Sequence, residues 1–189
     1  MASSFKSSKS RITSQAIAGE ATIDRSTEDI VTIDHAHHEI HAGDSFFISG
    51  FEDLANSATA SFLFVTPDGN KLGHFFHEIS AEAEMDFFLY EGTVVSPSGS
   101  AIPIINRNRN SATTSSFLVF SGSTVTSFGD ILEGVKLGSG KKAGGVKRGE
   151  NEIVLNNNTK YLCLTRNVSG GTAWVNFYVS WYEHTDKNQ

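Results

Sequence analysis

The sequence has little of what stabilises a small domain covalently or holds a chain in a membrane. Its 189 residues include one cysteine, Cys163, so no disulfide can form within the chain. No run approaches the roughly 18 to 20 apolar residues of a membrane-spanning helix, and residues 1–6 lack the apolar stretch of a secretory signal. We therefore expect a protein that is synthesised in a cytoplasm, has no membrane partner and is held together by packing and hydrogen bonds.

Positive charge is also scarce. The chain carries 15 lysines and arginines against 21 aspartates and glutamates, which gives a formal net charge of -6. Proteins that coat nucleic acid or bind anionic membranes usually carry an excess of basic residues. The charge balance therefore argues against a direct nucleic-acid partner.

Proline and methionine, with three and two residues, are rare beside 14 phenylalanines and 17 glycines. Apolar residues alternate or cluster in short runs separated by turn residues, which is typical of strands. No window shows a clear helical stripe, although 51–56 and 128–137 could each hold a turn or two of helix. The expected strands are 30–34, 37–41, 45–49, 58–66, 72–79, 84–91, 101–106, 115–120, 150–155, 160–166 and 172–182.

This pattern predicts an all-β fold, an antiparallel β-sandwich of the jelly-roll type, in a single domain over residues 21–189. Residues 67–70 (PDGN) and 156–159 (NNNT) are predicted hairpin turns, because proline fixes φ while glycine and asparagine tolerate positive φ.

Residues 1–20 are predicted to form an extended arm in front of this domain. Their first 14 positions hold six serines and three basic residues, Lys6, Lys9 and Arg11, with no acidic residue. Such a segment buries too little apolar surface to fold alone. We expect a neighbouring subunit or a larger partner to hold it.

Five aromatic doublets lie in the predicted strands: Phe46-Phe47, Phe75-Phe76, Phe87-Phe88, Phe177-Tyr178 and Trp181-Tyr182. Neighbouring residues in a strand point to opposite faces of a sheet, so each doublet places a ring on both sides. In 172–182 one face is a core face, whereas the other carries Trp174, Tyr178 and Tyr182, a composition typical of protein–protein interfaces. We therefore predict a homo-oligomer with these three residues in its interface. The alternative is that loops and the N-terminal arm cover the rings within one chain.

Four of the seven histidines lie in residues 35–41. In an extended strand His35, His37 and His41 would share one face, and imidazoles at that spacing could bind zinc, nickel or iron. The His-x-His pair resembles a cupin signature, but Glu39 follows it too early for that motif. The alternatives are a cupin-like metal-binding protein, a structural metal site, or histidines that only hydrogen-bond to backbone or neighbours. We expect the last, and no cofactor.

Nothing else in the sequence predicts catalysis. There is no G-x-S-x-G nucleophile motif, and Cys163 is centred in a short apolar run that is typical of a small buried side chain. We expect that the protein is not an enzyme.

Several segments resemble structural proteins of tailed bacteriophages. They are residues 33–43 with the following Phe46-Phe47, residues 87–92, the Asn-Arg loop 106–110 and the closing stretch 179–186. The resemblance implies a virion component, similar in size and strand pattern to capsid decoration (cement) proteins. Those proteins bind the outer capsid surface at junctions between capsomers, usually as symmetric oligomers.

The resulting prediction is a non-enzymatic capsid decoration protein, made in the cytoplasm of a bacterial host. It would bind the major capsid protein of the assembled shell as a homotrimer, with a dimer as second choice, and stabilise the shell by mass action. The arm would grip the capsid through Lys6, Lys9 and Arg11. The alternatives are a tail or head-fibre protein that binds a host surface, and a cupin-like metal-binding protein.

Overall fold

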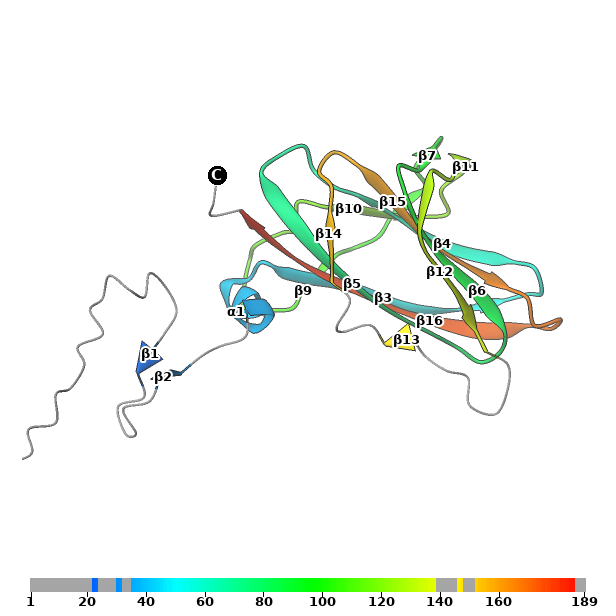
Figure 1. Cartoon of the computed structure of the whole chain (residues 1–189), viewed down its shortest axis with the longest axis horizontal. Helices are drawn as coiled ribbons and strands as arrows, with labels where there is room; N and C mark the ends of the chain where they lie inside the picture. Colours follow the sequence, from blue (N-terminus) through cyan, green and yellow to red (C-terminus); the bar gives the residue numbers. More distant parts are fainter. Residues whose placement is uncertain (1–21, 24–29, 32–34, 139–145, 148–151, 186–189) are drawn as a thin grey trace, which may run out of the picture. The chain divides into compact units, whose positions relative to one another are not determined.

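The computed structural model describes residues 22–23, 30–31, 35–138, 146–147 and 152–185 (Figure 1). The predicted arm 1–20, with Lys6, Lys9 and Arg11, lies outside the described residues. Backbone contacts divide the chain into a unit that ends at His38 and a unit that begins at Glu39. In the first unit β1 (Thr22–Ile23) pairs antiparallel with β2 (Ile30–Val31).

The second unit is an antiparallel β-sandwich, as predicted at that level. Sheet I has the strand order β12 (Asp130–Leu137), β6 (Met85–Glu91), β15 (Lys160–Asn167), β4 (Thr59–Val65), β10 (Leu118–Ser121), β8 (Ser100–Ala101). Sheet II has the order β13 (Val146–Lys147), β5 (Lys71–Ala81), β16 (Ala173–Thr185), β3 (Ser45–Leu54), β9 (Ile105–Asn106), and β14 (Ile153–Leu155) also pairs with β5. A separate two-stranded sheet pairs β7 (Val94–Val95) with β11 (Val125–Ser127).

Figure 1 shows the two sheets packed as layers. The core between them is rich in aromatic rings. The predicted core face of the last strand is confirmed, since Ala173, Val175, Phe177, Val179 and Trp181 are each at most 4% exposed. Phe62 of sheet I meets Phe177 edge-on at 4.6 Å between ring centroids, and Phe117 stacks on Trp181 at 5.5 Å. Each fully buried ring contributes about 1.5–3 kcal/mol relative to an exposed one.

The two predicted hairpin turns instead connect the sheets. Residues 67–70 lead from β4 of sheet I to β5 of sheet II, and 156–159 lead back from β14 to β15. The two connections are bonded to each other: the Thr66 hydroxyl donates to the Asn156 carbonyl at 2.7 Å, and the Asn158 amide donates to the Pro67 carbonyl at 2.9 Å. The hairpin prediction was wrong because turn residues fix a reversal of the chain and not the sheet that receives the next strand.

The predicted strand 37–41 is also wrong, because His35–Ala42 forms an α-helix, α1. The helix ends in a Schellman motif: Gly43, at φ +84°, donates to the Ile40 carbonyl at 3.1 Å, and Asp44 donates to the Glu39 carbonyl at 3.0 Å. A side chain at position 43 would also collide with Ser111. This end therefore requires a glycine.

Three further differences concern strands. The possible helical turns at 51–56 and 128–137 are instead the end of β3 and the edge strand β12. The predicted strand 101–106 is split into β8 and β9 around Pro103, which has no N–H to donate to a ladder. Within the described ranges, no helical segment has the length and apolarity that crossing a membrane requires.

Candidate functional site

The chain itself covers the centre of the outer face of sheet I. Val95 of β7 packs against Leu63 and Leu162, which are both fully buried although they point away from the main core. Partly buried apolar residues complete this second cluster: Val65, Tyr90, Phe120, Val125 and Leu164. Figure 1 shows β7 and β11 beside sheet I, on the side away from sheet II. On this sheet the cover over Leu63 and Leu162 comes from the same chain, through β7 and β11, and the rings Tyr90 and Phe120 are partly buried beneath it.

The outer face of sheet II carries six aromatic side chains, which we call the aromatic face: Phe47, Phe51, Phe76, Trp174, Tyr178 and Tyr182. The cross-strand pairs of β16 with β3 and β5 place them on the side opposite Val175 and Phe177. Among the described residues, no second apolar cluster like that over sheet I lies on this side. Phe51 is 72% exposed and Trp174 is 37% exposed, so part of this face is open.

The rings of the aromatic face partly cover one another. Phe47 stacks on Tyr178 with 5.5 Å between ring centroids, and Phe76 lies 6.0 Å from Tyr182. Ser180, flanked in the ladder by Phe47 and Phe76, is only 8% exposed as a result. Of the three predicted interface residues, Trp174 is exposed and Tyr178 is half-buried.

Tyr182 is different, since it is 6% exposed and packed within its own chain. Its ring stacks on His74 at 4.4 Å, and its hydroxyl donates to Glu152 at 2.6 Å. The same Glu152 carboxylate accepts a hydrogen bond from Nδ1 of His74, and Nε2 of His74 faces Nε2 of His184 at 2.6 Å. Sequence reasoning missed this cluster, because only the pairing of β5, β14 and β16 brings its four residues together.

The predicted metal candidates His35, His37 and His41 lie on α1. The expectation that they share a strand face is wrong, since residues two apart on a helix point in different directions and only His37 and His41, four apart, share a face. The part of the chain that the structure describes contains no group of three or more His, Cys, Asp or Glu side chains placed to hold a metal ion. His74 and His77 lie on opposite faces of β5, with His77 buried in the core.

Three side chains with ionisable groups, His77, Glu133 and Cys163, lie inside the sandwich and contact other parts of the core. Nε2 of His77 lies 3.4 Å from the Glu133 carboxylate, and the His77 ring lies 5.0 Å from the Phe87 ring. Burial raises the pKa of the Cys163 thiol far above its usual value, and the nearby negative charge of Glu133 adds to the shift. The thiol therefore stays protonated at neutral pH, and the prediction of a small buried side chain at Cys163 is confirmed.

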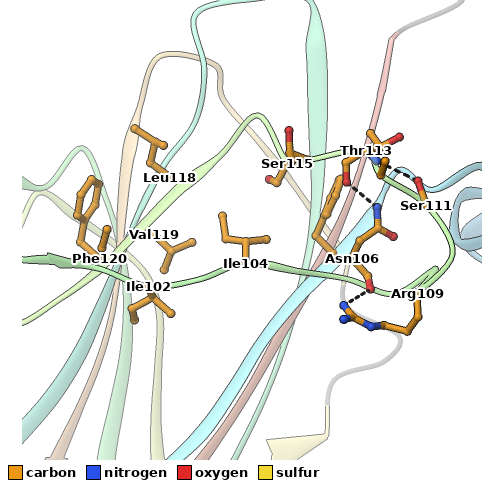
Figure 2. A pocket seen from close by; sticks show the side chains of 14 residues that line it. Ile102, Ile104, Asn106, Arg109, Ser111, Thr113, Ser115, Leu118, Val119 and Phe120 are labelled. Atoms are coloured by element: carbon orange, nitrogen blue, oxygen red, sulfur yellow. Dashed lines mark hydrogen bonds between the residues drawn. The ribbon is translucent and has the colours of Figure 1, made fainter.

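A cavity of about 440 Å³ opens between residues 101–106 and 109–120 (Figure 2). Ile102, Ile104, Leu118, Val119 and Phe120 line one end, and Asn106, Arg109, Ser111, Thr113 and Ser115 line the other. The lining includes no histidine, cysteine or carboxylate, so it offers no general base. It suits a ligand that joins an apolar group to a polar or anionic one.

Two buried polar side chains shape the polar end of this cavity. Asn106 donates to the carbonyls of Gly43 at 2.7 Å and Thr113 at 2.9 Å. Glu183, only 1% exposed, accepts from the Ser116 amide at 3.0 Å and from the indole N–H of Trp181 at 3.0 Å. These bonds fix the loop that follows β9, so the cavity is part of the rigid sandwich.

Comparison with protein-family models, with curated proteins and with solved structures finds no match to this chain. The assignment of a function therefore depends on the geometry of the chain itself.

Proposed function

We propose that this protein is a non-enzymatic virion structural protein that self-associates through the aromatic face and decorates the assembled capsid of a tailed bacteriophage. One observation carries the proposal: β7 and β11 cover the centre of the outer face of sheet I and leave Leu118 and Ile131 exposed, whereas the described residues provide no such cover for sheet II, where Phe51 and Trp174 are exposed. Exposed contiguous apolar surface usually marks a protein–protein contact.

The strand pairing supports a sandwich of the jelly-roll type. β3 pairs with β16, β4 with β15, β5 with β14 and β6 with β12, so that early strands pair with late ones in nested order. Successive members of this series alternate between sheet II and sheet I. Rolling up one long antiparallel hairpin gives this arrangement, and jelly rolls are frequent in viral capsid domains.

A second copy of the chain is the occupant that best suits the aromatic face. The chain has a net charge of -6, so two copies repel each other over most of their surfaces. Between Trp174 and Tyr182 the outward residues of β16 are uncharged: Asn176, Tyr178 and Ser180. Two exposed carboxylates flank this row, Asp53 opposite Trp174 and Glu78 opposite Tyr178. Homo-oligomer interfaces are more apolar than the rest of a protein surface. We propose a homotrimer, with a dimer as the second arrangement.

The partner of this oligomer would be the major capsid protein on the outer surface of the virion. A protein that binds only the assembled shell stabilises it by the free energy of binding. Several copies of the arm 1–20 on one oligomer would add avidity through a high effective concentration. No nucleic-acid contact, membrane contact or cofactor is part of this mechanism.

Sedimentation equilibrium tests the self-association. We expect an oligomer at micromolar concentration, and we expect the double substitution Phe51→Ser and Trp174→Ser to raise its dissociation constant by roughly 30-fold or more, as loss of an interface hot spot of about 2 kcal/mol does. The matched control is Ile131→Ser, which removes a 61% exposed side chain from β12 of sheet I. A monomeric wild type, or an equal effect of the control, would contradict the proposal.

The capsid role is tested on particles of the phage that encodes the protein. We expect hundreds of copies per virion, in a fixed ratio to the major shell subunit, and rebinding of the purified protein to shells that lack it. A chain without residues 1–20 should occupy fewer sites. A copy number in the tens would instead indicate a tail or head fibre.

A further inference from the structure

Part of β3 lies at an open edge of sheet II. The strand β16 pairs with all ten residues of β3, whereas β9, on the other side of β3, pairs only with Phe46 and Phe47. Among the described residues, no further strand borders this side of β3. Residues 49–53 are all exposed. Residues 48–54 of β3 therefore have a neighbouring strand on one side only.

The pairing of β3 shows which backbone groups face outward at this edge. The Ser45 carbonyl accepts a hydrogen bond from the Arg107 amide at 2.8 Å, so the backbone groups of Ser45 point away from β16. Every second residue of a strand points its N–H and C=O in the same direction. The residues of the open edge that do so are Ser49, Phe51 and Asp53. They present donors and acceptors that no described strand uses.

A cavity of about 250 Å³ lies beside this edge, on the inner side of sheet II. Gly50 and Glu52 face that side, because they pair with the core residues Phe177 and Val175. A Cβ atom at Gly50 would meet no other atom within 4 Å. The remaining wall includes Phe62, Ile102 and Ser121. The edge therefore has room for an additional apolar side chain between the two sheets.

We propose that this edge binds an extended segment of a partner protein as an additional antiparallel strand of sheet II. Strand addition takes its affinity from main-chain hydrogen bonds and its specificity from pockets for alternate side chains. The residue opposite Phe51 exchanges two backbone hydrogen bonds with it. The residue opposite Gly50 places its side chain in the cavity, where the rings of Phe62 and Phe177 favour an apolar group.

The charges along the edge favour a basic partner. Glu52 on the inner side and Asp53 on the outer side are exposed, and neither forms a salt bridge with another described residue. Opposite charges directly across neighbouring strands attract, whereas like charges repel. Two copies of this acidic edge therefore disfavour pairing with each other. The antiparallel partner has two adjacent basic residues, one residue other than proline and a large apolar residue, in that order.

The exposed edge of sheet I is less suited to strand addition. The edge strand β12 has a bulge between Ile131 and Glu133, whereas the register of β3 with β16 is unbroken. Bulges twist an edge and protect it against additional strands. The exposed Lys136 of β12 would also repel a basic segment. The site is therefore assigned to β3.

Isothermal titration calorimetry with synthetic peptides tests the site. The probe is the peptide Ser-Thr-Lys-Lys-Val-Phe-Val-Thr with both ends capped, whose phenylalanine would lie opposite Gly50. N-methylation of the valine before the phenylalanine removes the N–H that donates to the Phe51 carbonyl, and it should weaken binding about tenfold or more. N-methylation of the phenylalanine is the matched control, because this N–H points away from β3. It should leave the affinity within about twofold.

Variants of the protein test the cavity and the charges. Gly50→Val fills the space that the phenylalanine of the peptide requires, and valine suits a strand, so it should abolish binding at the peptide concentration that saturates the wild type while the circular dichroism spectrum is retained. Glu52→Gln combined with Asp53→Asn should weaken binding about fivefold. Asp130→Asn, on β12, is the matched control and should leave the affinity unchanged.

Several outcomes would overturn the proposal: no binding of the unmodified peptide, equal losses for the two N-methylated peptides, full binding by Gly50→Val, or an unchanged affinity after removal of both carboxylates. Weaker binding by Asp130→Asn would also overturn it, since the site would then lie on β12. The comparison of the two N-methylated peptides uses the wild-type protein, so it does not depend on whether a variant folds. The double variant Phe51→Ser and Trp174→Ser should still bind the peptide, because it retains the backbone groups of β3. Strand addition and the proposed homo-oligomer can therefore fail independently.

Discussion

The outer faces of the two sheets both carry apolar side chains, but they differ in how far the chain buries them. Both carry large apolar side chains that water would hydrate poorly. On sheet I the chain supplies its own cover, so Leu63 and Leu162 are fully buried. On sheet II the rings cover one another in part, and Phe51 and Trp174 stay exposed. A strand with two apolar sides therefore indicates that something covers both of them, but not whether the cover belongs to the same chain.

Truncation of a buried leucine on the outer face of sheet I should lower the free energy of unfolding more than any other change considered below. Leu162→Ala should lower the free energy of unfolding by about 2–5 kcal/mol, as such substitutions do in buried sites. Phe51→Ala, on the outer face of sheet II, should change it by no more than about 0.5 kcal/mol in the monomer, because its ring is 72% exposed. Urea unfolding at low protein concentration measures both. Similar losses in the two variants would remove the distinction between the faces.

Alkaline pH should weaken the main core, through the two ionisable side chains that β15 of sheet I directs into it. Burial raises the pKa of the Tyr161 hydroxyl, with its hydrogen bond to Glu91 contributing, and burial also raises the pKa of the Cys163 thiol. The unfolded chain releases these protons near its ordinary values of 10.0 and 9.0, whereas the folded chain retains them. The contribution to stability is therefore complete below pH about 9 and is lost as the pH rises, by up to about 1.4 kcal/mol per pH unit for each group.

Urea unfolding at a series of pH values checks this slope. The double variant Tyr161→Phe and Cys163→Ala should have a lower stability at neutral pH but a flatter dependence above pH about 9. An equally steep fall in that variant would show that other groups cause it.

Removing the cover itself gives a smaller but more specific effect. Val95→Ser should lower the free energy of unfolding by about 1–2 kcal/mol, because it takes an apolar side chain out of the cluster with Leu63 and Leu162. It should also increase binding of the dye ANS, since the outer face of sheet I becomes accessible. Ile131→Ser, at an exposed position of the same sheet, is the control and should change neither quantity.

Removal of a salt bridge on sheet I should change the free energy of unfolding least. Arg166 and Asp86 form a salt bridge of 2.7 Å on sheet I, with the arginine side chain 51% exposed. Arg166→Gln should lower the free energy of unfolding by less than about 1 kcal/mol, and the difference should disappear in about 1 M salt. A difference that persists at high salt would mean that the aliphatic part of Arg166, rather than its charge, stabilises the sheet.

Local periodicity predicted the strands and their faces well. Val175 and Phe177 were assigned to the core from alternation alone, and they are at most 4% exposed. The sandwich follows from such patterns because burial of one face requires a second layer. The helix α1 escaped prediction because its eight residues have no apolar stripe, and its end depends on the backbone geometry of Gly43.

Features that depend on which distant strands pair with each other could not be predicted from the sequence. The cover over sheet I begins with Val94 and Val95, and two residues are too short a run to identify as a strand. The cluster of His74, Glu152 and His184 spans 110 positions of the sequence, and only the register of β5 with β14 and β16 brings it together. Register follows from the packing of whole sheets, which no single segment encodes.

The central place of β16 in sheet II determines when this protein can fold. Its neighbours on either side, β3 and β5, are synthesised about a hundred residues before it. Until β16 has been synthesised, both neighbours lack their shared partner and expose unpaired backbone groups. Sheet II is therefore completed only after β3 and β5 have waited for about a hundred residues, and a truncated chain that ends before position 173 would have a split sheet with a strong tendency to aggregate.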